Sequence, residues 1–248
     1  MNILNKTVLI TGGGSGIGFQ IAKLLTEKGN KVIITGRSEA RLKAAAAKLD
    51  NVDIFAGDIT KEEDISKLVS FLNQQYPTLD ILINNAGQAF IYKLAAETPA
   101  FENASAEILT NYSSVIRLID KLLPLLKTQK EAAIVNVTSV LAIAPSYDVP
   151  TYSASKAALH SYTQALRFSL AGSDPSIKVF ELMPPLVDTE FSAEIGGSNG
   201  IPASQVAEEL LNGLENNIEE IHVGFTAQFY DAYLKSPADA FKMLNARR

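Results

Sequence analysis

Tyr152 and Lys156 lie four residues apart, and together they could exchange a proton with a bound molecule. On a helix this spacing places two side chains on one face, one turn apart. A phenol with its ordinary pKa of about 10 is a poor base at neutral pH, but a nearby ammonium stabilises the phenolate. The pair therefore predicts a tyrosine that works as a general acid–base and a lysine that lowers its pKa.

Two further polar residues precede this pair in the chain. Ser139 follows a predicted strand, where its hydroxyl could donate to a substrate oxygen that gains negative charge. Serine at a strand end is also ordinary turn chemistry. Asn111 falls inside a predicted helix, although asparagine is a mediocre helix former. It is either an incidental surface residue or one retained for function.

A glycine-rich segment, Thr11-Gly12-Gly13-Gly14-Ser15-Gly16-Ile17-Gly18, joins the first predicted strand to the first predicted helix. Strand, glycine turn and helix in this order direct free backbone N–H groups and a helix N-terminus at a pyrophosphate. Gly12 permits the turn, Gly16 lets the backbone approach the phosphates, and Gly18 lets helix and strand pack closely. The spacing differs from the general dinucleotide fingerprint, and the alternative is a glycine turn that binds no ligand.

The end of the second predicted strand indicates which dinucleotide binds. NAD(H) sites place a carboxylate there, whereas an arginine nearby accommodates the 2′-phosphate of NADP(H). The corner reads Thr35-Gly36-Arg37-Ser38, without a carboxylate. Arg37 therefore favours NADP(H) over NAD(H), unless it is simply a solvated side chain. Asp58, after the third strand, could accept from the adenine amino group or be a turn residue ahead of Thr60.

Short runs rich in valine and isoleucine alternate with helical patterns along the chain. They are predicted to be strands, at residues 7–11, 31–35, 52–57, 79–84, 132–139, 177–183 and 219–225. Continuous apolar strands are typical of a parallel sheet with helices on both faces. No linker, repeat or composition shift marks a second domain, so we expect one α/β domain over residues 1–248. Its fold should be a Rossmann-like, doubly wound sheet of about seven strands that binds ligands at their carboxyl ends.

The helices between these strands have recognisable ends. They are predicted at residues 15–28, 103–127, 152–172 and 237–245. Another helix is predicted to begin with Thr60 as N-cap and Glu63 as its capping-box partner. The segment 190–203, within a substrate loop of about residues 186–203, has loop composition. It is either a mobile lid or a linker.

Composition excludes several classes of function. The net charge of −5 disfavours nucleic-acid and anionic-membrane partners, which reward a basic face. No apolar run is long enough to span a membrane, and Met1–Lys6 is too short and polar for a signal peptide. A cytoplasmic location is therefore expected. There is no cysteine, and His160 and His222 stand alone, so no metal site is expected.

Together these features resemble the short-chain dehydrogenase/reductase family. The motifs that match in order and spacing are Thr11-Gly12-x-x-x-Gly16-x-Gly18, Asp58, Asn84-Asn85-Ala86-Gly87, Asn111, Ser139, Tyr152 and Lys156. The match extends over about residues 5–190, and the combination is very specific. In one departure, Pro185 replaces the glycine that follows Pro184 in the family pattern and stiffens the backbone. In another, Ser15 stands where many NADP-binding relatives carry a basic residue.

The resemblance implies a catalytic tetrad of Asn111, Ser139, Tyr152 and Lys156. Tyr152 would exchange the proton, and Lys156 would lower its pKa and bind the nicotinamide ribose. Ser139 would orient the substrate oxygen, and Asn111 would anchor a water in a proton relay. The resemblance also implies a cofactor-binding set of Thr11, Gly12, Gly14, Ser15, Gly16, Ile17, Gly18, Arg37, Asp58, Ile59, Asn85, Ala86, Gly87, Tyr152, Lys156, Pro184, Val187 and Thr189.

The expected activity is hydride transfer between NADP(H) and a carbonyl or alcohol. The substrate pocket is expected to be mostly apolar and lined by Gln88, Ala89, Phe90, Val140, Leu141, Ile143, Tyr147, Leu186 and Phe191. None is a cation that could clamp a carboxylate, so we expect an uncharged ketone or aldehyde. The alternatives are a 3-ketoacyl-thioester reductase, which should carry a basic docking patch, and a non-catalytic NADP-binding sensor. The resemblance also implies a homodimer or homotetramer, assembled across the helices predicted at residues 103–127 and 152–172.

Overall fold

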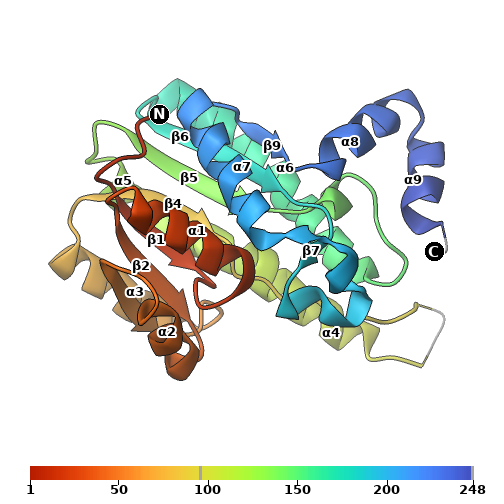
Figure 1. Ribbon diagram of the computed structural model, residues 1–248, viewed down its shortest axis with the longest axis horizontal. Helices are drawn as coiled ribbons and strands as arrows, with labels where there is room; N and C mark the ends of the chain where they lie inside the picture. The colour runs from red at the N-terminus through yellow and green to blue at the C-terminus, as the bar shows by residue number, and fades with distance from the viewer. Residues whose placement is uncertain (95–96, 247–248) are drawn as a thin grey trace.

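Seven parallel strands form the central sheet of the computed structural model, which describes residues 1–94 and 97–246 (Figure 1). Their order across the sheet is β3-β2-β1-β4-β5-β6-β9. Their bounds are β1 (Thr7–Thr11), β2 (Lys31–Gly36), β3 (Val52–Ala56), β4 (Leu79–Asn84), β5 (Ala132–Val137), β6 (Ile177–Met183) and β9 (Glu220–His222). The strand order reverses between β1 and β4. In a doubly wound sheet, this point at the carboxyl ends is where ligands bind, so the predicted Rossmann-like fold is confirmed.

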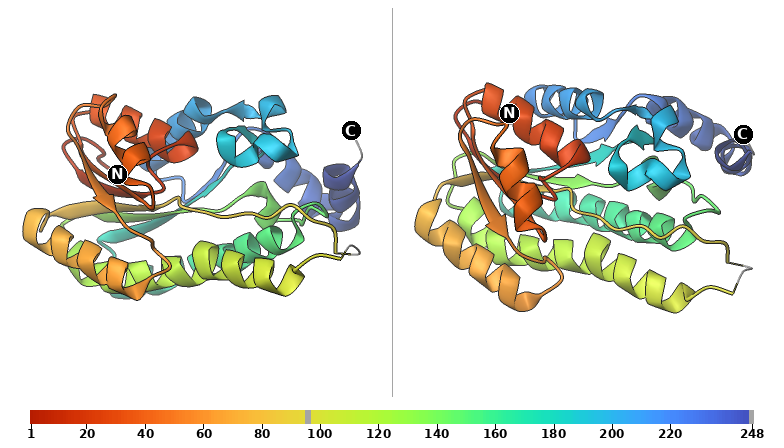
Figure 2. Two further views of the ribbon diagram at one scale, coloured as in Figure 1. Left: turned by 90° about the horizontal axis from the view of Figure 1, so that it is seen from below. Right: turned by 60° about the horizontal axis from the view of Figure 1, so that its bottom comes forward.

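Helices cover both faces of the sheet, as the two views of Figure 2 show. One face carries α1 (Gly16–Glu27), α2 (Glu39–Ala46) and α7 (Ala203–Asn216), and the other carries α3 (Glu62–Gln75), α5 (Ser114–Leu126) and α6 (Pro150–Ser173). Each face buries its own cluster of aliphatic side chains against the strands. A helix that connects two parallel strands must cross over one face of the sheet. Strands and helices therefore alternate along the chain, and the helices on each face bury one of the two clusters.

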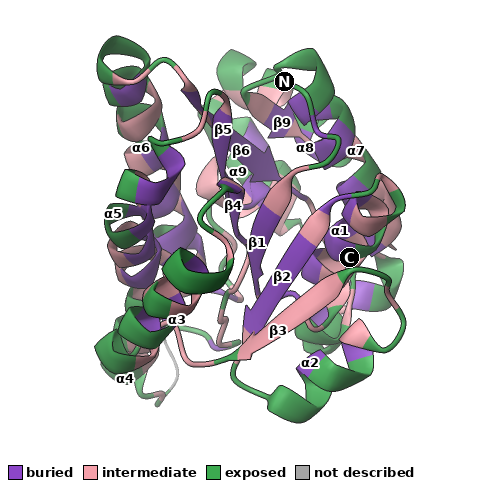
Figure 3. Cartoon of the chain, turned by 90° about the vertical axis from the view of Figure 1, so that its left-hand side faces the viewer, coloured by how far each residue is buried: buried purple, intermediate pink, exposed green. Residues whose placement is uncertain are grey.

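The inner strands are buried and the edge strand β3 is only half-buried (Figure 3). Every residue of β5 is buried, and so are all but one of the residues of β4. This confirms the expectation from the continuous apolar runs, since helices exclude water from both faces. Glu181 in β6 is charged rather than apolar, but it is as fully buried as its neighbours, with 0 % exposure.

The helix predicted at residues 103–127 is present, but it is not a uniform α-helix. The chain instead forms α4 (Ala100–Ile108), a π-helical turn over Leu109–Ser113, and then α5. In the π turn the Ser114 hydroxyl donates to the carbonyl of Leu109 at 2.7 Å. Asn111 is buried within this turn. Single π turns are frequent at functional sites, so the poor helix former at this position marked a real local irregularity.

The capping box predicted at Thr60 is wrong. The backbone N–H and the hydroxyl of Thr60 both donate to Asp58 Oδ1, at 2.9 and 2.8 Å. These bonds hold Thr60 in a turn, and α3 begins only at Glu62 with Lys61 in the capping position. A short polar side chain two residues earlier competed successfully for the groups that a cap would have used.

Three predicted strands end earlier than expected. β3 stops at Ala56, one residue short. β5 stops at Val137, so Ser139 lies beyond it and caps a short 3₁₀ turn by accepting from the N–H of Leu141 at 3.1 Å. β9 covers Glu220–His222 only. Gly224, with a φ of 50°, turns the chain out of the sheet. α8 (Phe225–Lys235) follows directly.

The segments after β6 flank the carboxyl ends of the strands. β7 (Val187–Asp188) pairs in parallel with β8 (Ile201–Pro202), and two 3₁₀ turns lie between them. α9 (Pro237–Asn245) confirms the predicted final helix and forms a hairpin with α8. This hairpin packs on the loop after β5 through a small cluster that includes Val140 and Phe229. Over the described residues, no helix is long and apolar enough to cross a membrane.

Candidate active site

A cleft of about 1450 Å³ opens at the carboxyl ends of the strands. Most of the predicted site residues line it, namely Gly12, Gly14, Ser15, Gly16, Ile17, Arg37, Asp58, Ile59, Asn85, Ala86, Gly87, Ser139, Tyr152, Lys156, Pro184, Val187 and Thr189. Thr11, Gly18 and Asn111 lie behind this lining. Of the predicted substrate residues, Ala89, Phe90 and Ile143 do not reach the cleft, whereas it is lined by Gln88, Val140, Leu141, Tyr147, Leu186 and Phe191.

The glycine loop brings backbone, rather than side chains, to the cleft. Gly12 has a φ of +67°, which side chains rarely tolerate, and a Cβ there would lie 2.9 Å from the Cα of Ala86. A Cβ on Gly18 would lie 2.4 Å from the carbonyl oxygen of Gly12, so the helix can approach the loop only at glycine. The N-terminus of α1 has no side-chain cap from Ser15 and no acidic residue in its first turn. Such a helix end fits the pyrophosphate of a dinucleotide.

Thr11 and Asn85 join the glycine loop to the end of β4. The Thr11 hydroxyl accepts from the N–H groups of Asn85 and Ala86, both at 3.0 Å. The Asn85 side-chain amide donates to the carbonyls of Thr11 and Gly12, at 3.0 and 3.2 Å. Both residues therefore hold the shape of the loop, and Asn85 lines the cleft as well.

The far end of the cleft holds Arg37 and Asp58. Burial alone would raise the pKa of Asp58, but hydrogen bonds from Thr60 and the charge of Arg37 bring it below its ordinary value. Sequence reasoning missed a second arginine here. Arg41 forms a two-pronged ion pair with Glu190, at 2.8 and 3.2 Å, and both residues line the cleft. The pair links α2 to the 3₁₀ turn after β7.

Tyr152 lies in the first turn of α6, where Pro150 starts the helix at the edge of the cleft. Its ring lies 6.0 Å from that of Phe191, measured between centroids. Burial raises the pKa of Tyr152, and the neighbouring Ser139 hydroxyl acts in the opposite direction. Burial is the largest influence on this pKa, and a lowering of it by Lys156 stays a prediction. The phenol is therefore held protonated at neutral pH.

Lys156 is buried one turn further along α6, with 3 % exposure. Its ammonium donates to the carbonyl oxygen of Val137, at 2.8 Å, and lies 5.7 Å from the centre of the Tyr152 ring. Burial lowers the pKa of Lys156 to about 8, and the charge of Glu181 opposes that fall. The end of β5 therefore positions the lysine through a backbone acceptor, next to the tyrosine.

Asn111 is placed beside these residues, and its side chain makes three hydrogen bonds within the protein. It donates to the carbonyl of Gln88 and to the hydroxyl of Ser155, and it accepts from the N–H of Gln88, at 2.8, 2.9 and 2.8 Å. These bonds tie the π turn to the loop after β4 and to α6.

Asn84, the first residue of the Asn84-Asn85-Ala86-Gly87 motif, braces the sheet. Its amide donates to Asn136 on β5, and Asn136 donates to the Thr163 hydroxyl on α6, both at 2.9 Å. The chain of hydrogen bonds joins β4, β5 and α6 behind the cleft.

Two features of the site had no clear signal in the sequence. Glu107 on α4 is fully buried and accepts from the N–H of Phe90 at 2.7 Å, and burial raises its pKa. Its charge raises the pKa of Tyr152. The C-terminal end also lines the cleft, through residues 244–246. There Asn245 donates to the carbonyl of Pro145 and accepts from the N–H of Tyr147, both at 3.0 Å.

Known proteins share this arrangement. Residues 6–199 match the family model of the short chain dehydrogenases. The uncharacterized oxidoreductase DltE of Bacillus subtilis (strain 168) is 39 % identical over 226 residues, which cover 89 % of each chain.

Two solved structures are similar over most of the chain. A short chain dehydrogenase from Burkholderia cenocepacia J2315 in complex with NADP has a TM-score of 0.86 and 28 % identity, over 100 % of both chains. The 3-ketoacyl-(acyl-carrier-protein) reductase from Brucella melitensis complexed with NADH has a TM-score of 0.76 and 29 % identity, over 86 % of this chain and 91 % of that one. Since the family model covers most of the sequence and agrees with the sheet and cleft, the chain belongs to the short chain dehydrogenase family of oxidoreductases.

Proposed function

We propose that this protein is an NADP(H)-dependent reductase of uncharged ketones or aldehydes. The observation that carries the proposal is the shared cleft, in which Ser139, Tyr152 and Lys156 lie together at one end of the surface that begins at the glycine loop. The glycine loop fits a dinucleotide, and the three side chains fit the chemistry of a carbonyl oxygen.

The three side chains have separate tasks in the proposed reaction. A bound nicotinamide supplies the hydride. The Ser139 hydroxyl donates a hydrogen bond to the carbonyl oxygen, and the Tyr152 phenol gives that oxygen its proton. Because burial raises the pKa of Tyr152, the phenol carries the proton that reduction consumes. The Lys156 ammonium stabilises the phenolate that remains.

The remaining predicted cofactor residues are assigned to the two ends of the dinucleotide. Pro184, Val187 and Thr189 would hold the carboxamide end. Arg37 would bind the 2′-phosphate, because the end of β2 brings this arginine and no carboxylate to the cleft. The similarity to an NADP complex supports this preference, while the similarity to an NADH complex calls for a direct comparison of the two cofactors.

The charges along the cleft support an uncharged substrate. Among the described residues that line it, the cations are Arg37, Arg41 and Lys156. The two arginines lie at the end proposed for adenosine, and Lys156 is buried beside Tyr152. The other end is lined by apolar side chains that include Leu141 and Phe191. A substrate carboxylate would therefore lose its hydration without gaining a partner.

Steady-state reduction of a broad carbonyl panel, with NADPH and NADH in parallel, tests the proposal. We expect NADPH to be oxidised by neutral aryl or alkyl ketones or aldehydes, faster than by 2-keto acids. Tight NADPH binding with no turnover across the panel would instead identify a cofactor sensor. Equal affinity for NADH would remove the role given to Arg37.

A second candidate activity is reduction of a 3-ketoacyl thioester. The similarity to the Brucella melitensis reductase favours it, whereas the net charge of −5 argues against a basic docking surface. A ketoacyl thioester included in the same panel separates the two candidates. A value of kcat/KM for the thioester well above that of every simple ketone would establish the second.

We also propose a homodimer or homotetramer, assembled over α5 and α6. Phe168 on the outer side of α6 is 86 % exposed, and such an aromatic side chain is suited to an interface. Light scattering on the purified protein measures the mass, and a monomer at micromolar concentration would exclude this assembly.

A further inference from the structure

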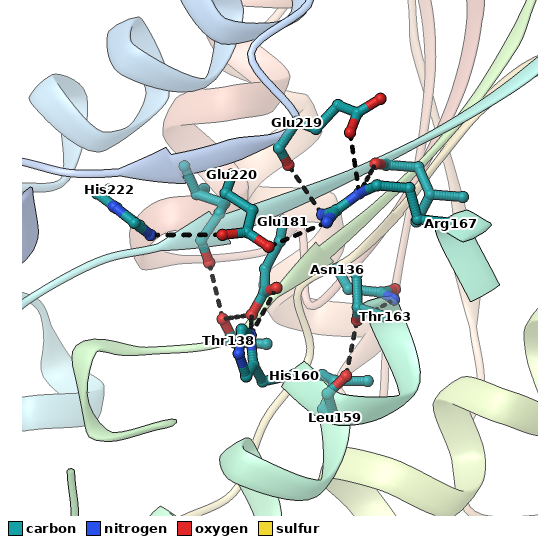
Figure 4. Close-up of polar contacts among 12 residues, drawn as sticks. Asn136, Thr138, Leu159, His160, Thr163, Arg167, Glu181, Glu219, Glu220 and His222 are labelled. Atoms are coloured by element: carbon teal, nitrogen blue, oxygen red, sulfur yellow. Dashed lines mark hydrogen bonds and ion pairs between the residues drawn. The ribbon is translucent and has the colours of Figure 1, made fainter. Parts of the chain in front are cut away.

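Glu181 is a carboxylate in the interior of the molecule, and Figure 4 shows the side chains around it. It lies in β6 with 0 % exposure. His160 Nδ1 lies 2.9 and 3.0 Å from its two oxygens, and the Thr138 hydroxyl donates to it at 2.6 Å. Both partners come from other elements, α6 and the end of β5. The carboxylate is therefore built into the structure, with three contacts to its oxygens.

The same two elements position Lys156. Val137, Thr138 and Ser139 are consecutive: the first accepts from the Lys156 ammonium, the second donates to Glu181, and the third lines the cleft beside Tyr152. On α6, His160 lies one turn beyond Lys156 and two turns beyond Tyr152, so the three share one helix face. His160 thus extends the row formed by Tyr152 and Lys156 on this helix face, and Glu181 contacts His160 from β6.

Stability alone does not account for a carboxylate at this position. Its neighbours in β6, Phe180 and Leu182, are apolar and fully buried. Replacing a buried ion pair by apolar residues is often neutral or stabilising, because desolvation offsets the attraction. A buried pair that shares α6 and the segment 137–139 with Lys156 is better explained by what its charge does to the lysine.

We propose that Glu181, held by His160 and Thr138, is the buried counter-charge that keeps the Lys156 ammonium charged in the cleft. This makes Glu181 a positioning residue that acts through Lys156, and its catalytic consequence rests on the proposed function. Burial works against the charge of Lys156, and Glu181 is the acid that opposes this effect.

Because its partner is a histidine, the support that Glu181 gives to the Lys156 ammonium depends on pH. Hydrogen bonding to Glu181 raises the pKa of His160, so His160 is charged at low pH and shares the carboxylate. As pH rises and His160 loses its proton, Glu181 faces Lys156 with its full charge. The support from Glu181 is therefore greater after His160 has lost its proton.

Other titratable and charged groups lie near Glu181, His160 and Lys156 or near the residues next to them. They are Tyr152 and Arg167 on α6, Glu219 beside β9, Glu220 and His222 on β9, Asp231 on α8, and Glu107 on α4. Arg167 pairs with Glu220 at 3.0 Å. Glu220 thus has its own cation and is a matched control for Glu181 within one cluster.

The direct test is the titration of the Lys156 amino group by NMR, with lysine labelled at the Cε carbon. The spectrum of Lys156→Met identifies the signal. We expect Glu181→Gln, which keeps the size and an acceptor for Thr138, to lower the midpoint by about one pH unit. Glu220→Gln should leave the midpoint unchanged. An unchanged midpoint in folded Glu181→Gln, or an equal fall in both variants, overturns the proposal.

Turnover gives a second measurement that a merely structural role would not move. Plotted against pH, kcat/KM for NADPH-dependent reduction should fall at lower pH in Glu181→Gln than in the wild type, with similar values on the acidic side. A uniform loss at every pH would contradict the assignment. Because the NMR titration needs no substrate, a protein that reduces no carbonyl would refute the proposed function and still answer the question about Glu181.

Discussion

The two ends of the cleft are built by different means. At the end formed by β1, β2 and β4, the protein presents backbone and glycine, and its buried polar residues are neutral. At the end formed by β5, β6 and α6, it buries ionisable groups. All charged residues that are buried in the described chain, Glu107, Lys156 and Glu181, follow residue 100.

This difference separates the residues proposed to bind the cofactor from those proposed to act on the substrate. A pyrophosphate is recognised by backbone N–H groups, which hold their direction without any buried charge. A proton transfer needs groups whose pKa differs from its ordinary value, and burial near other charges provides this. The cost in folding stability should therefore fall on the catalytic end, and the tolerance to small steric changes should be lowest at the glycine loop.

The largest effect is expected for Tyr152→Phe, which removes the proposed proton donor and keeps the ring. We expect kcat for carbonyl reduction to fall by about 10²–10⁴-fold. The affinity for NADPH, measured by fluorescence titration, should stay within a factor of two or so of the wild type. A variant that retains full turnover would show that the catalytic end does not work through this phenol.

Lys156→Met should stabilise the protein while it lowers turnover. Burial lowers the pKa of Lys156 from 10.5 to about 8, so the unfolded state binds a proton between these values and the folded state does not. The free energy of unfolding therefore rises with pH from about 8 to 10.5, and below 8 the full cost of the buried ammonium remains.

That cost is on the order of 3 kcal/mol. Urea denaturation at pH 7 and pH 9 should show a more stable variant at the lower pH and a smaller difference at the higher one. A variant that is less stable than the wild type at neutral pH would show that packing of the lysine stem, and not its charge, dominates.

Gly18→Ala tests the close packing of α1 against the glycine loop. The added methyl would lie 2.4 Å from the carbonyl oxygen of Gly12 and 2.5 Å from the Asn85 amide. We expect a loss of about 1–3 kcal/mol in stability and a weaker affinity for NADPH. Gly172→Ala is the matched control, because nothing lies within 4 Å of the new atom and alanine favours a helix. Equal thermal denaturation of the two variants would contradict the tight approach at Gly18.

The smallest effect is expected for Arg37→Ala. This arginine is exposed, and a hydrogen bond to a charged group contributes about 1.5–3 kcal/mol. The KM for NADPH should rise about tenfold or more, with little change for NADH. Lys43→Ala, on the exposed surface of α2, is a control for loss of a positive charge near this end. A similar rise for both cofactors would indicate that Arg37 does not read the 2′-phosphate.

Local sequence patterns predicted many of the strand and helix bounds and the pairing of Tyr152 with Lys156. The strands β1, β4 and β6 and the helix α9 have the predicted bounds. Tyr152 and Lys156 meet because four residues on a helix always place two side chains on one face. The failure at Thr60 and the π turn inside the helix predicted over residues 103–127 were also local. In each case a polar side chain formed a hydrogen bond that the average propensity does not include.

Local patterns could not predict which buried charged groups lie close together. Glu181 left a visible sign, one carboxylate inside an apolar strand, but its partner His160 is 21 residues away. Which acid faces Lys156 depends on the register of β5 against β6 and on how α6 packs over both. The C-terminal residues 244–246 reach the cleft only because α8 and α9 fold back over the loop after β5.

The parallel sheet, the glycine loop and the pairing of Tyr152 with Lys156 could therefore be predicted from the amino-acid sequence, since each depends on backbone geometry and spacing along one element. How far Tyr152 and Lys156 are buried, and which carboxylates lie close to them, depended on the tertiary structure. The physical reason is that a pKa depends on every charge and dipole within several ångströms, and folding brings these together from distant parts of the chain.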